Sequence, residues 1–270
     1  MSHLLIFGPG YSAGYIAGRL RAAGWQVSSV TRATIDDREL VRDALKRATH
    51  ILSSVPPDRD GDPVLARHAD AIAAAPAAWV GYLSSTGVYG DSGGAWLDES
   101  APVAGRRPGR NAADLAWQQI HDAARVFRLP GIYGPGRSAL ERVAEGRAHR
   151  IDLPGQVFSR IHVDDIAGGV IASFEAGRPG VYNLADDLPA PQNDVIAYAA
   201  PLLGLPVPPL QTLESAALSA EARAFYAENR RIANGKARRL LGWQPRYADF
   251  RSGLRSLLQD RRDLPTPMTP

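Results

Sequence analysis

Short apolar segments that alternate with helix-like amphipathic segments constrain the fold of this chain more than any other feature. HLLIFG (3–8), WQVSSVTR (25–32), THILSSVPP (49–57) and WVGYLSS (79–85) each have the composition of a short strand, and helical patterns separate them. Parallel strands need long crossover connections, so this alternation predicts βαβ units with helices on both faces of a sheet. We predict an α/β protein with a Rossmann-type doubly wound parallel sheet.

The alternation weakens in the second half of the chain, where prolines become frequent between Ala190 and Arg231. We predict that 1–135, 161–184 and 232–260 form a nucleotide-binding domain. A small substrate-binding lobe is then made of 136–160 and 185–231. The polar, proline-rich end RRDLPTPMTP (261–270) predicts a disordered tail.

The composition excludes several classes of protein. The 270 residues include no cysteine, which excludes disulfides and thiolate chemistry and favours a reducing compartment. No apolar run reaches the roughly 20 residues that a membrane span needs, and no signal segment precedes the first strand, so we expect a cytoplasmic protein without a membrane partner. The net charge is +3, but the arginines are interleaved with acids, which argues against a nucleic-acid partner and leaves a small-molecule substrate.

A glycine turn follows the first predicted strand and opens the first predicted helix. Its sequence, Gly8-Pro9-Gly10-Tyr11-Ser12-Ala13, matches the dinucleotide pattern G-x-G-x-x-G/A. The two glycines allow a tight turn and a close approach of a pyrophosphate, and the helix N-terminus supplies N–H donors and partial positive charge. A turn of purely structural importance is the alternative. We predict that the NAD(P) site includes Gly8, Gly10, Tyr11, Ser12 and Ala13.

The residues after the second strand bear on which dinucleotide binds. Thr31 and Arg32 stand where an NAD site usually has an acid, and Asp36 and Asp37 come several residues later. An arginine favours the 2′-phosphate of NADP, with NAD as the alternative if Arg32 is only an exposed side chain. Three residues at the next strand end face the same crevice and complete this part of the predicted cofactor site, namely Ser53, Ser54 and Val55.

Five further segments occur in an order that resembles a known family. They are YLSSTGVYGD, RLPGIYGPGR, FSRIHVDDIAGGV, GVYNLADD and KARRLLGWQPRY. Together with the glycine turn they resemble the extended short-chain dehydrogenase/reductases, the NAD-dependent epimerase/dehydratase family. The resemblance implies a substrate cleft above the strand ends and, as the family's usual assembly, a homodimer.

The same resemblance implies roles for individual residues. Ser85 takes the place of the catalytic serine, whose hydroxyl bonds the substrate oxygen that becomes or begins as a carbonyl. Ser84, Pro130 and Ile132 fall beside the nicotinamide. Basic residues of the later segments are candidates for substrate binding because a guanidinium suits a carboxylate or phosphate, and the predicted set is Arg110, Arg137, Arg160 and His162.

The Tyr-x-x-x-Lys pair that completes the family's active site is absent. The two lysines are Lys46 and Lys236, and neither has a tyrosine four residues before it. Arg110 and Asp114 stand at the two positions, which resembles the atypical subgroup that lacks the pair. The i, i+4 spacing predicts an ion pair between them on one helix face.

Other residues are candidates for the missing proton chemistry. An arginine can anchor an anion but cannot shuttle a proton, so Asp114 is the candidate base at these two positions. Tyr89 and Tyr133 are alternative phenols at strand ends, and we retain Ser85, Tyr89 and Asp114 as the candidate catalytic residues. No metal site is predicted.

These observations predict an NADP- or NAD-dependent oxidoreductase or epimerase/dehydratase that acts on a small polar substrate such as a sugar or a sugar nucleotide. The alternative is a non-catalytic NAD(P)-binding sensor or scaffold, which the absent tyrosine and lysine favour. The connections near 33–48 and 110–125 are short for the family. Either the sheet is trimmed there or residues are missing from the chain.

Overall fold

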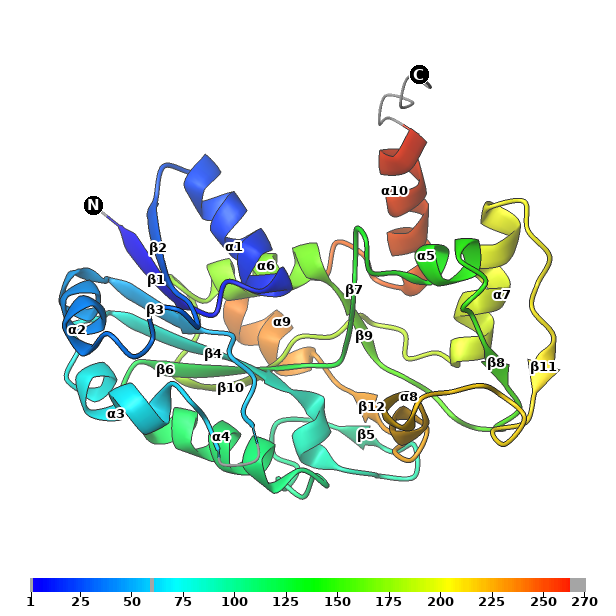
Figure 1. Ribbon diagram of the computed structural model, residues 1–270, viewed down its shortest axis with the longest axis horizontal. Coiled ribbons are helices and arrows are strands. Elements are labelled where there is room, and N and C mark those ends of the chain that lie inside the picture. Colours follow the sequence, from blue (N-terminus) through cyan, green and yellow to red (C-terminus); the bar gives the residue numbers. More distant parts are fainter. Residues whose placement is uncertain (1, 59–60, 263–270) are drawn as a thin grey trace.

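A six-stranded parallel sheet forms the centre of the computed structural model, which describes residues 2–58 and 61–262 (Figure 1). In spatial order the strands are β10 (Gly180–Asn183), β6 (Ala124–Leu129), β4 (Trp79–Ser85), β3 (His50–Ser53), β1 (His3–Phe7) and β2 (Gln26–Val30). All pairings between neighbouring strands are parallel. The predicted α/β class and Rossmann-type sheet are confirmed.

Alternate residues of β1 show how the sheet is covered on both faces. Leu4 and Ile6 pack in one core cluster with apolar residues of α1 (Tyr11–Ala22), α6 (Val163–Ala172) and α9 (Gly235–Leu241). Leu5 and Phe7 pack on the opposite face in a cluster that includes residues of α2 (Arg38–Arg47), α3 (Leu65–Ala73) and α4 (Pro108–Gln119). Alternate strand residues therefore face opposite sides of the sheet, and the apolar faces of the helices cover both sides, as in a doubly wound fold.

The connection between β2 and β3 explains the short segment at 33–48. It contains α2 alone, and β3 lies on the other side of β1 from β2. Between α4 and β6 only residues 120–123 intervene. Neither connection contains a further strand, and β2 is therefore an edge strand of the sheet. The sheet of this chain is therefore trimmed at these two connections.

A lobe lies beside the strand ends and has a core of its own. Buried residues of α5 (Ala139–Ala144), α7 (Gln192–Leu202) and α10 (Phe250–Arg262) form this third cluster (Figure 1). The remaining elements are β5 (Trp96–Leu97) paired with β12 (Arg231–Ile232), β7 (Gly131–Tyr133) with β9 (Arg160–His162), β8 (Arg150–Ile151) with β11 (Leu210–Gln211), the 3-10 helix η1 (Thr86–Tyr89) and α8 (Ala220–Phe225).

The position of α10 differs from the predicted division of the chain. The prediction places 232–260 in the nucleotide-binding domain, but Phe250 and Leu254 of α10 pack in the lobe cluster with α5 and α7. The other predicted domain boundaries stay a prediction. Of the predicted tail, 261 and 262 end α10 and 263–270 lie outside the described residues. Within the ranges described, no helix is long and apolar enough to cross a membrane.

Candidate functional site

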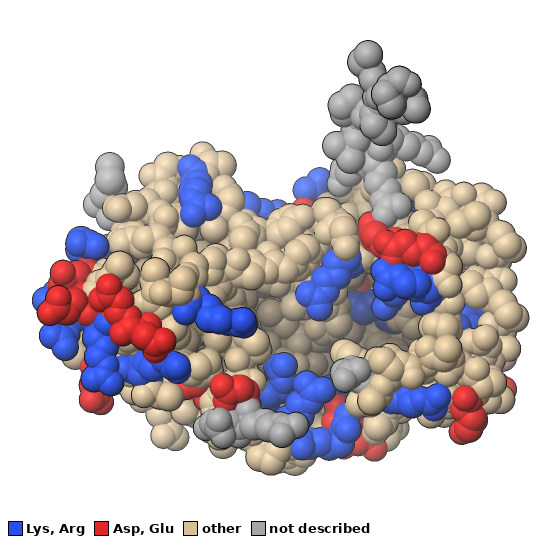
Figure 2. All heavy atoms as spheres, viewed as in Figure 1, with Lys and Arg blue, Asp and Glu red and all other residues tan. Residues whose placement is uncertain are grey.

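A cleft of about 1040 Å³ runs along the carboxyl ends of the central strands and the facing side of the lobe. Residues from the glycine turn, the ends of β3 and β4, the first turn of α4, β7 and the lobe line it together. Figure 2 shows Lys and Arg side chains gathered around the hollow in this face of the molecule. Ligands of doubly wound sheets bind in such a crevice outside the strand ends.

The glycine turn is held between two strand ends. Gly8 has a φ of +72° and its N–H donates to the carbonyl of Val30 at 2.9 Å. A Cβ at Gly8 would lie 2.6 Å from Cγ2 of Val55, and the hydroxyl of Ser54 donates to the carbonyl of Gly8. The predicted cofactor residues Ser53–Val55 are thus beside the turn, although Ser53, Val55, Gly8 and Ala13 lie behind the cleft surface rather than on it.

The N-terminus of α1 has the features of an anion-binding end. Gly10 caps the helix with no side-chain hydrogen bond, and the first turn contains no acidic residue. The N–H groups of a first helical turn have no intrahelical acceptor, so those of Tyr11, Ser12 and Ala13 are available to a phosphate. Gly10, Tyr11 and Ser12 line the cleft. These residues fit a dinucleotide pyrophosphate.

Arg32 follows β2 at the same edge of the sheet and is exposed. The two acids that come after it are both engaged elsewhere. Asp36 accepts a bond from Nε of Arg67 at 2.7 Å, and Asp37 caps α2 by accepting from the N–H of Leu40 at 3.0 Å. Neither carboxylate is therefore placed to neutralise Arg32, and the described residues give Arg32 no ion pair.

Two neighbouring serines at the end of β4 present opposite hydrogen-bonding groups to the cleft. The hydroxyl of Ser84 donates to Oδ2 of Asp114 at 2.6 Å, so its proton is committed and only its lone pairs remain. The oxygen of Ser85 instead accepts from the N–H of Gly87 at 3.1 Å, which leaves its proton free to donate. Both serines line the cleft. Ser85 is thus the hydroxyl able to polarise a substrate oxygen.

Asp114 is paired with Arg128 of β6, and the predicted ion pair with Arg110 is wrong. Nη2 of Arg128 lies 2.6 Å from Oδ1 and Nε lies 3.1 Å from Oδ2, and both side chains are almost fully buried. Gln118 and Ser84 donate to the same carboxylate. A buried guanidinium and a carboxylate in reach satisfy each other better than two groups exposed on a helix face. Asp114 has no remaining position for a substrate proton.

Tyr89, another candidate for catalysis, is buried beneath the site. Its hydroxyl donates to Oδ1 of Asn183 at 2.7 Å, and the guanidinium of Arg128 lies 4.7 Å from its ring centre. Burial raises the pKa of the Tyr89 phenol, and Tyr89 does not line the cleft. Tyr133 lines the cleft, and burial raises its phenol pKa as well.

The remaining predicted residues fall into two groups. Pro130, Ile132, Arg110 and Arg137 line the cleft, and the guanidinium of Arg137 lies 5.6 Å from the ring centre of Tyr11 at the start of α1. His162 is 2 % exposed and lies outside the lining. Its Nδ1 accepts from the N–H of Asp164 at 3.2 Å, so it caps α6.

Arg160 also lines the cleft, but its guanidinium is used within the protein. Nη1 donates to the carbonyls of Phe158 and Ala190 at 2.8 Å each, and Nη2 donates to Gln192 at 2.9 Å. Burial lowers the pKa of Arg160 to about 10. These bonds connect β9 to the start of α7, which indicates that Arg160 holds the lobe against the sheet.

Most of the arginines that line the cleft were not predicted from the sequence. Eight arginines line the cleft against two glutamates, and five of the arginines were not among the predicted site residues, namely Arg106, Arg107, Arg142, Arg147 and Arg230. Arg230 reaches the carbonyl of Gly90 from far along the chain. The sequence carried no signal for it, because arginines at such separations are brought together only by the tertiary fold.

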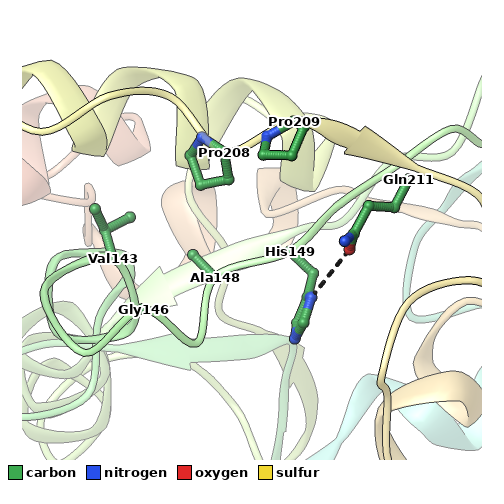
Figure 3. Close-up of a pocket in the computed structure, with 7 residues that line it drawn as sticks. All are labelled: Val143, Gly146, Ala148, His149, Pro208, Pro209 and Gln211. Carbon is green, nitrogen blue, oxygen red and sulfur yellow. Dashed lines mark hydrogen bonds between the residues drawn. The ribbon is translucent and has the colours of Figure 1, made fainter.

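A smaller pocket of about 230 Å³ lies in the lobe, between the end of α5 and β11 (Figure 3). Nδ1 of His149 lies 3.2 Å from Oε1 of Gln211 across its opening. His149 also lines the large cleft, so the two cavities share a wall.

Asp186 is a buried carboxyl between the sheet and the lobe. It follows β10, is 1 % exposed, and its N–H donates to the carbonyl of Arg160 at 2.7 Å. Burial raises its pKa from 3.8 to about 8, while the charge of Arg160 acts in the opposite direction. The folded protein therefore holds a proton here at pH values where the unfolded chain has released it.

Comparisons with known proteins agree with this fold. No family model matches the chain. A relative, the 3-diazoavenalumate denitrifying reductase of a Streptomyces species, is 29% identical in an alignment of 289 positions, gaps included, that covers 88% of this chain and 94% of that protein.

Two solved structures are similar over nearly the whole chain. A conserved protein of unknown function from Silicibacter pomeroyi is 42% identical, with a TM-score of 0.86, over 97% of this chain and 99% of that one. The structure of MoeE5 in complex with UDP-glucose and NAD has a TM-score of 0.79 at 19% identity, over 98% of this chain and 100% of that one. The predicted resemblance to the extended short-chain dehydrogenase/reductases is confirmed at the level of the fold.

We expect Asp114→Asn to lower the free energy of unfolding by about 3–5 kcal/mol, because it leaves the charge of Arg128 buried without a partner. Urea unfolding of the purified variant measures this change. Asp122→Asn, an exposed position just after α4, is the matched control and should change stability by less than about 0.5 kcal/mol. A stable Asp114→Asn protein would contradict the structural role given to this pair.

We expect the free energy of unfolding to fall as the pH rises from about 4 to about 8, because Asp186 binds its proton more tightly in the folded state. The contribution of this one group to the slope is at most about 1.4 kcal/mol per pH unit. Asp186→Asn removes it, so urea unfolding as a function of pH should show a flatter profile for this variant. Asp122→Asn at an exposed position is the control, and equal slopes in Asp186→Asn and Asp122→Asn would rule out the assignment.

Proposed function

We propose that this chain is an NAD(P)-dependent oxidoreductase acting on a small polar substrate. It belongs to the family of the Silicibacter pomeroyi protein and has the fold of the extended short-chain dehydrogenase/reductases. The observation that carries the proposal is a single cleft lined by both the uncapped start of α1 and the free hydroxyl of Ser85. The first feature suits a dinucleotide pyrophosphate and the second suits a reacting oxygen.

Three parts of the chain would hold the cofactor. The N–H groups of Tyr11, Ser12 and Ala13 would bind the pyrophosphate, and the β3 end would pack beside it. Pro130 and Ile132 would lie along the nicotinamide, as the family resemblance implies. Bound NAD(P) supplies or accepts the hydride of the reaction.

We further propose that the cofactor is NADP. The support is Arg32, which is exposed at the end of β2 while Asp36 and Asp37 are bonded elsewhere. A guanidinium favours a 2′-phosphate, and an engaged carboxylate is not available to bond a 2′-hydroxyl. MoeE5, whose structure contains NAD, does not decide this point for a chain only 19% identical to it.

The protonation states in the cleft favour reduction of the substrate over its oxidation. The lining includes the phenols Tyr11, Tyr133 and Tyr226, and burial raises the pKa of all three. A phenol with a raised pKa stays protonated near neutral pH, so none of the three is available as the base that oxidation of an alcohol needs, whereas the product oxygen of a reduction can take its proton from water. Ser85 would hydrogen-bond the substrate oxygen as negative charge develops on it. The 29% identical relative is itself named a reductase.

A second candidate is an epimerase or dehydratase reaction on a sugar nucleotide. The observation in its favour is the match to MoeE5, whose structure contains UDP-glucose and NAD. Such a reaction begins by oxidising an alcohol, which needs a base of the kind that Tyr-x-x-x-Lys supplies and that this chain lacks. Net consumption of NADPH during turnover would distinguish the reductase from this second candidate, in which the cofactor is regenerated.

Titration of the purified protein with NADPH and NADH, followed by nicotinamide fluorescence, tests the cofactor proposal. We expect Arg32→Ala to weaken NADPH binding by about tenfold to a hundredfold and to leave NADH binding nearly unchanged, because only NADPH carries the 2′-phosphate. Arg42→Ala, exposed on α2, is the control. If wild-type protein binds neither dinucleotide, the oxidoreductase proposal fails.

A screen of carbonyl compounds for NADPH oxidation tests the role of Ser85. With any substrate found, we expect Ser85→Ala to lower kcat by about a hundredfold or more and to leave NADPH affinity unchanged, because the hydroxyl acts on the developing oxyanion. Ser29→Ala, an exposed serine on β2, is the matched control. A Ser85→Ala protein with full turnover would instead support a reaction that does not use this hydroxyl.

A further inference from the structure

Arg110 is a half-buried cation that no residue within 2–58 and 61–262 neutralises. It lies in the first turn of α4 and lines the cleft. No described residue gives its guanidinium a hydrogen bond or an ion pair. Burial lowers its pKa, and the nearby charge of Arg107 lowers it further. A guanidinium that loses water without gaining a partner costs free energy, which an incoming anion would recover.

Arg107 lies directly beside Arg110 at the start of the same helix. The carbonyl of Arg107 accepts the N–H of Arg110 at 3.0 Å, and both side chains line the cleft. Arg107 is exposed, and the described part of the chain gives it no ion pair either. Two like charges one turn apart repel each other, so the pair is more stable with an anion bound than without one.

Other arginines of the cleft lining are already engaged within the protein. Arg106 and Arg230 bond to Glu228, at 2.6 Å and 2.5 Å. Arg160 donates to two carbonyls and to a glutamine. Asp114, one turn along α4 from Arg110, would be its natural partner but is bound by Arg128. Among the lining arginines to which the described residues give no ion pair, Arg107 and Arg110 are the two at the start of α4, whereas Arg142 belongs to α5 of the lobe and Arg137 lies against Tyr11.

The position of the pair indicates which ligand. Arg110 and Asp114 are four residues apart on α4 and therefore share a face, and Asp114 bonds Ser84 at the end of β4. Ser85 follows Ser84 and lines the same cleft. Arg107 and Arg110 are thus at the reacting end of the cleft. By contrast, Arg137 lies against Tyr11 at the start of α1, where the cofactor pyrophosphate would bind.

We propose that Arg107 and Arg110 form a subsite for an anionic group of the substrate, a carboxylate or a phosphate, and orient the substrate's reacting oxygen toward Ser85. This inference rests on the proposed function, because it assigns the substrate class of that same site. At the position where the family resemblance expects the catalytic tyrosine, the chain thus carries a binding residue. The substrate class is a small organic anion, and a neutral polar molecule lacks the group that the pair binds.

The test uses benzoate and phenyl phosphate as anionic probes and benzamide as the neutral probe, each titrated by calorimetry with and without saturating NADP⁺. We expect wild-type protein to bind at least one of the two anions more tightly than benzamide. Arg110→Gln should weaken that binding by about tenfold or more and leave NADPH affinity unchanged. Arg42→Gln on α2 is the matched control and should behave as the wild type. The benzoate and phenyl phosphate arms show whether the site prefers a carboxylate or a phosphate.

The proposal is overturned if both anions bind Arg110→Gln as tightly as wild type, or if neither binds wild-type protein better than benzamide. It is also overturned if Arg110→Gln loses NADPH affinity and retains anion binding, because the pair would then serve the cofactor. The proposed function is scored separately by NADPH binding to the wild type. A protein that binds no dinucleotide but binds benzoate through Arg110 would lose the oxidoreductase assignment and keep the anion subsite.

Discussion

The buried ion pair between Asp114 and Arg128 determines how the floor of the cleft is built. It joins α4 to β6 with two short charge-assisted bonds, and Ser84 of β4 and Gln118 of α4 donate to the same carboxylate. Removing two charges from water is costly, and the cost is offset only when nearly every polar atom finds a partner. The Asp114 carboxylate meets this condition with four bonds. The position of α4 relative to the strand ends, and hence of Arg110 above the cleft floor, depends on this pair.

The same pair occupies part of the place where the family resemblance expects catalytic residues. Where the family resemblance expects tyrosine and lysine on α4, this chain has an arginine and an aspartate, and the aspartate has become a structural group. Its bond to Ser84 fixes the direction of that hydroxyl, so Ser84 offers an acceptor and Ser85 offers a donor. Tyr133, a phenol of the cleft lining whose pKa burial raises, stays protonated near neutral pH and does not replace the missing base.

The sequence predicted the sheet and the glycine turn correctly because both depend on local patterns. Period-two strands, helical spacing and the short Gly8–Ala13 motif are readable within a few residues of one another. The sequence could not identify the partner of Asp114, because Arg128 belongs to the buried strand β6 and an arginine in a strand does not indicate which helix it will contact. Helical spacing suggested Arg110 instead. His162 likewise looked like a substrate ligand, and only its capping bond to Asp164 shows what it does.

The distribution of charge connects these local arrangements to the function. The whole chain carries a formal charge of only +3, yet the cleft lining alone has eight arginines and two glutamates. Acidic residues therefore outnumber basic ones on the rest of the chain, and the positive potential is concentrated in the cleft. A concave surface with low-dielectric walls focuses such a field and raises the local concentration of anions. NADP and an organic anion would both be drawn in, and they would bind different cations. Arg137 of the lining and Arg32, which follows β2 outside the lining, would serve NADP, and Arg107 and Arg110 at the start of α4 would serve the organic anion.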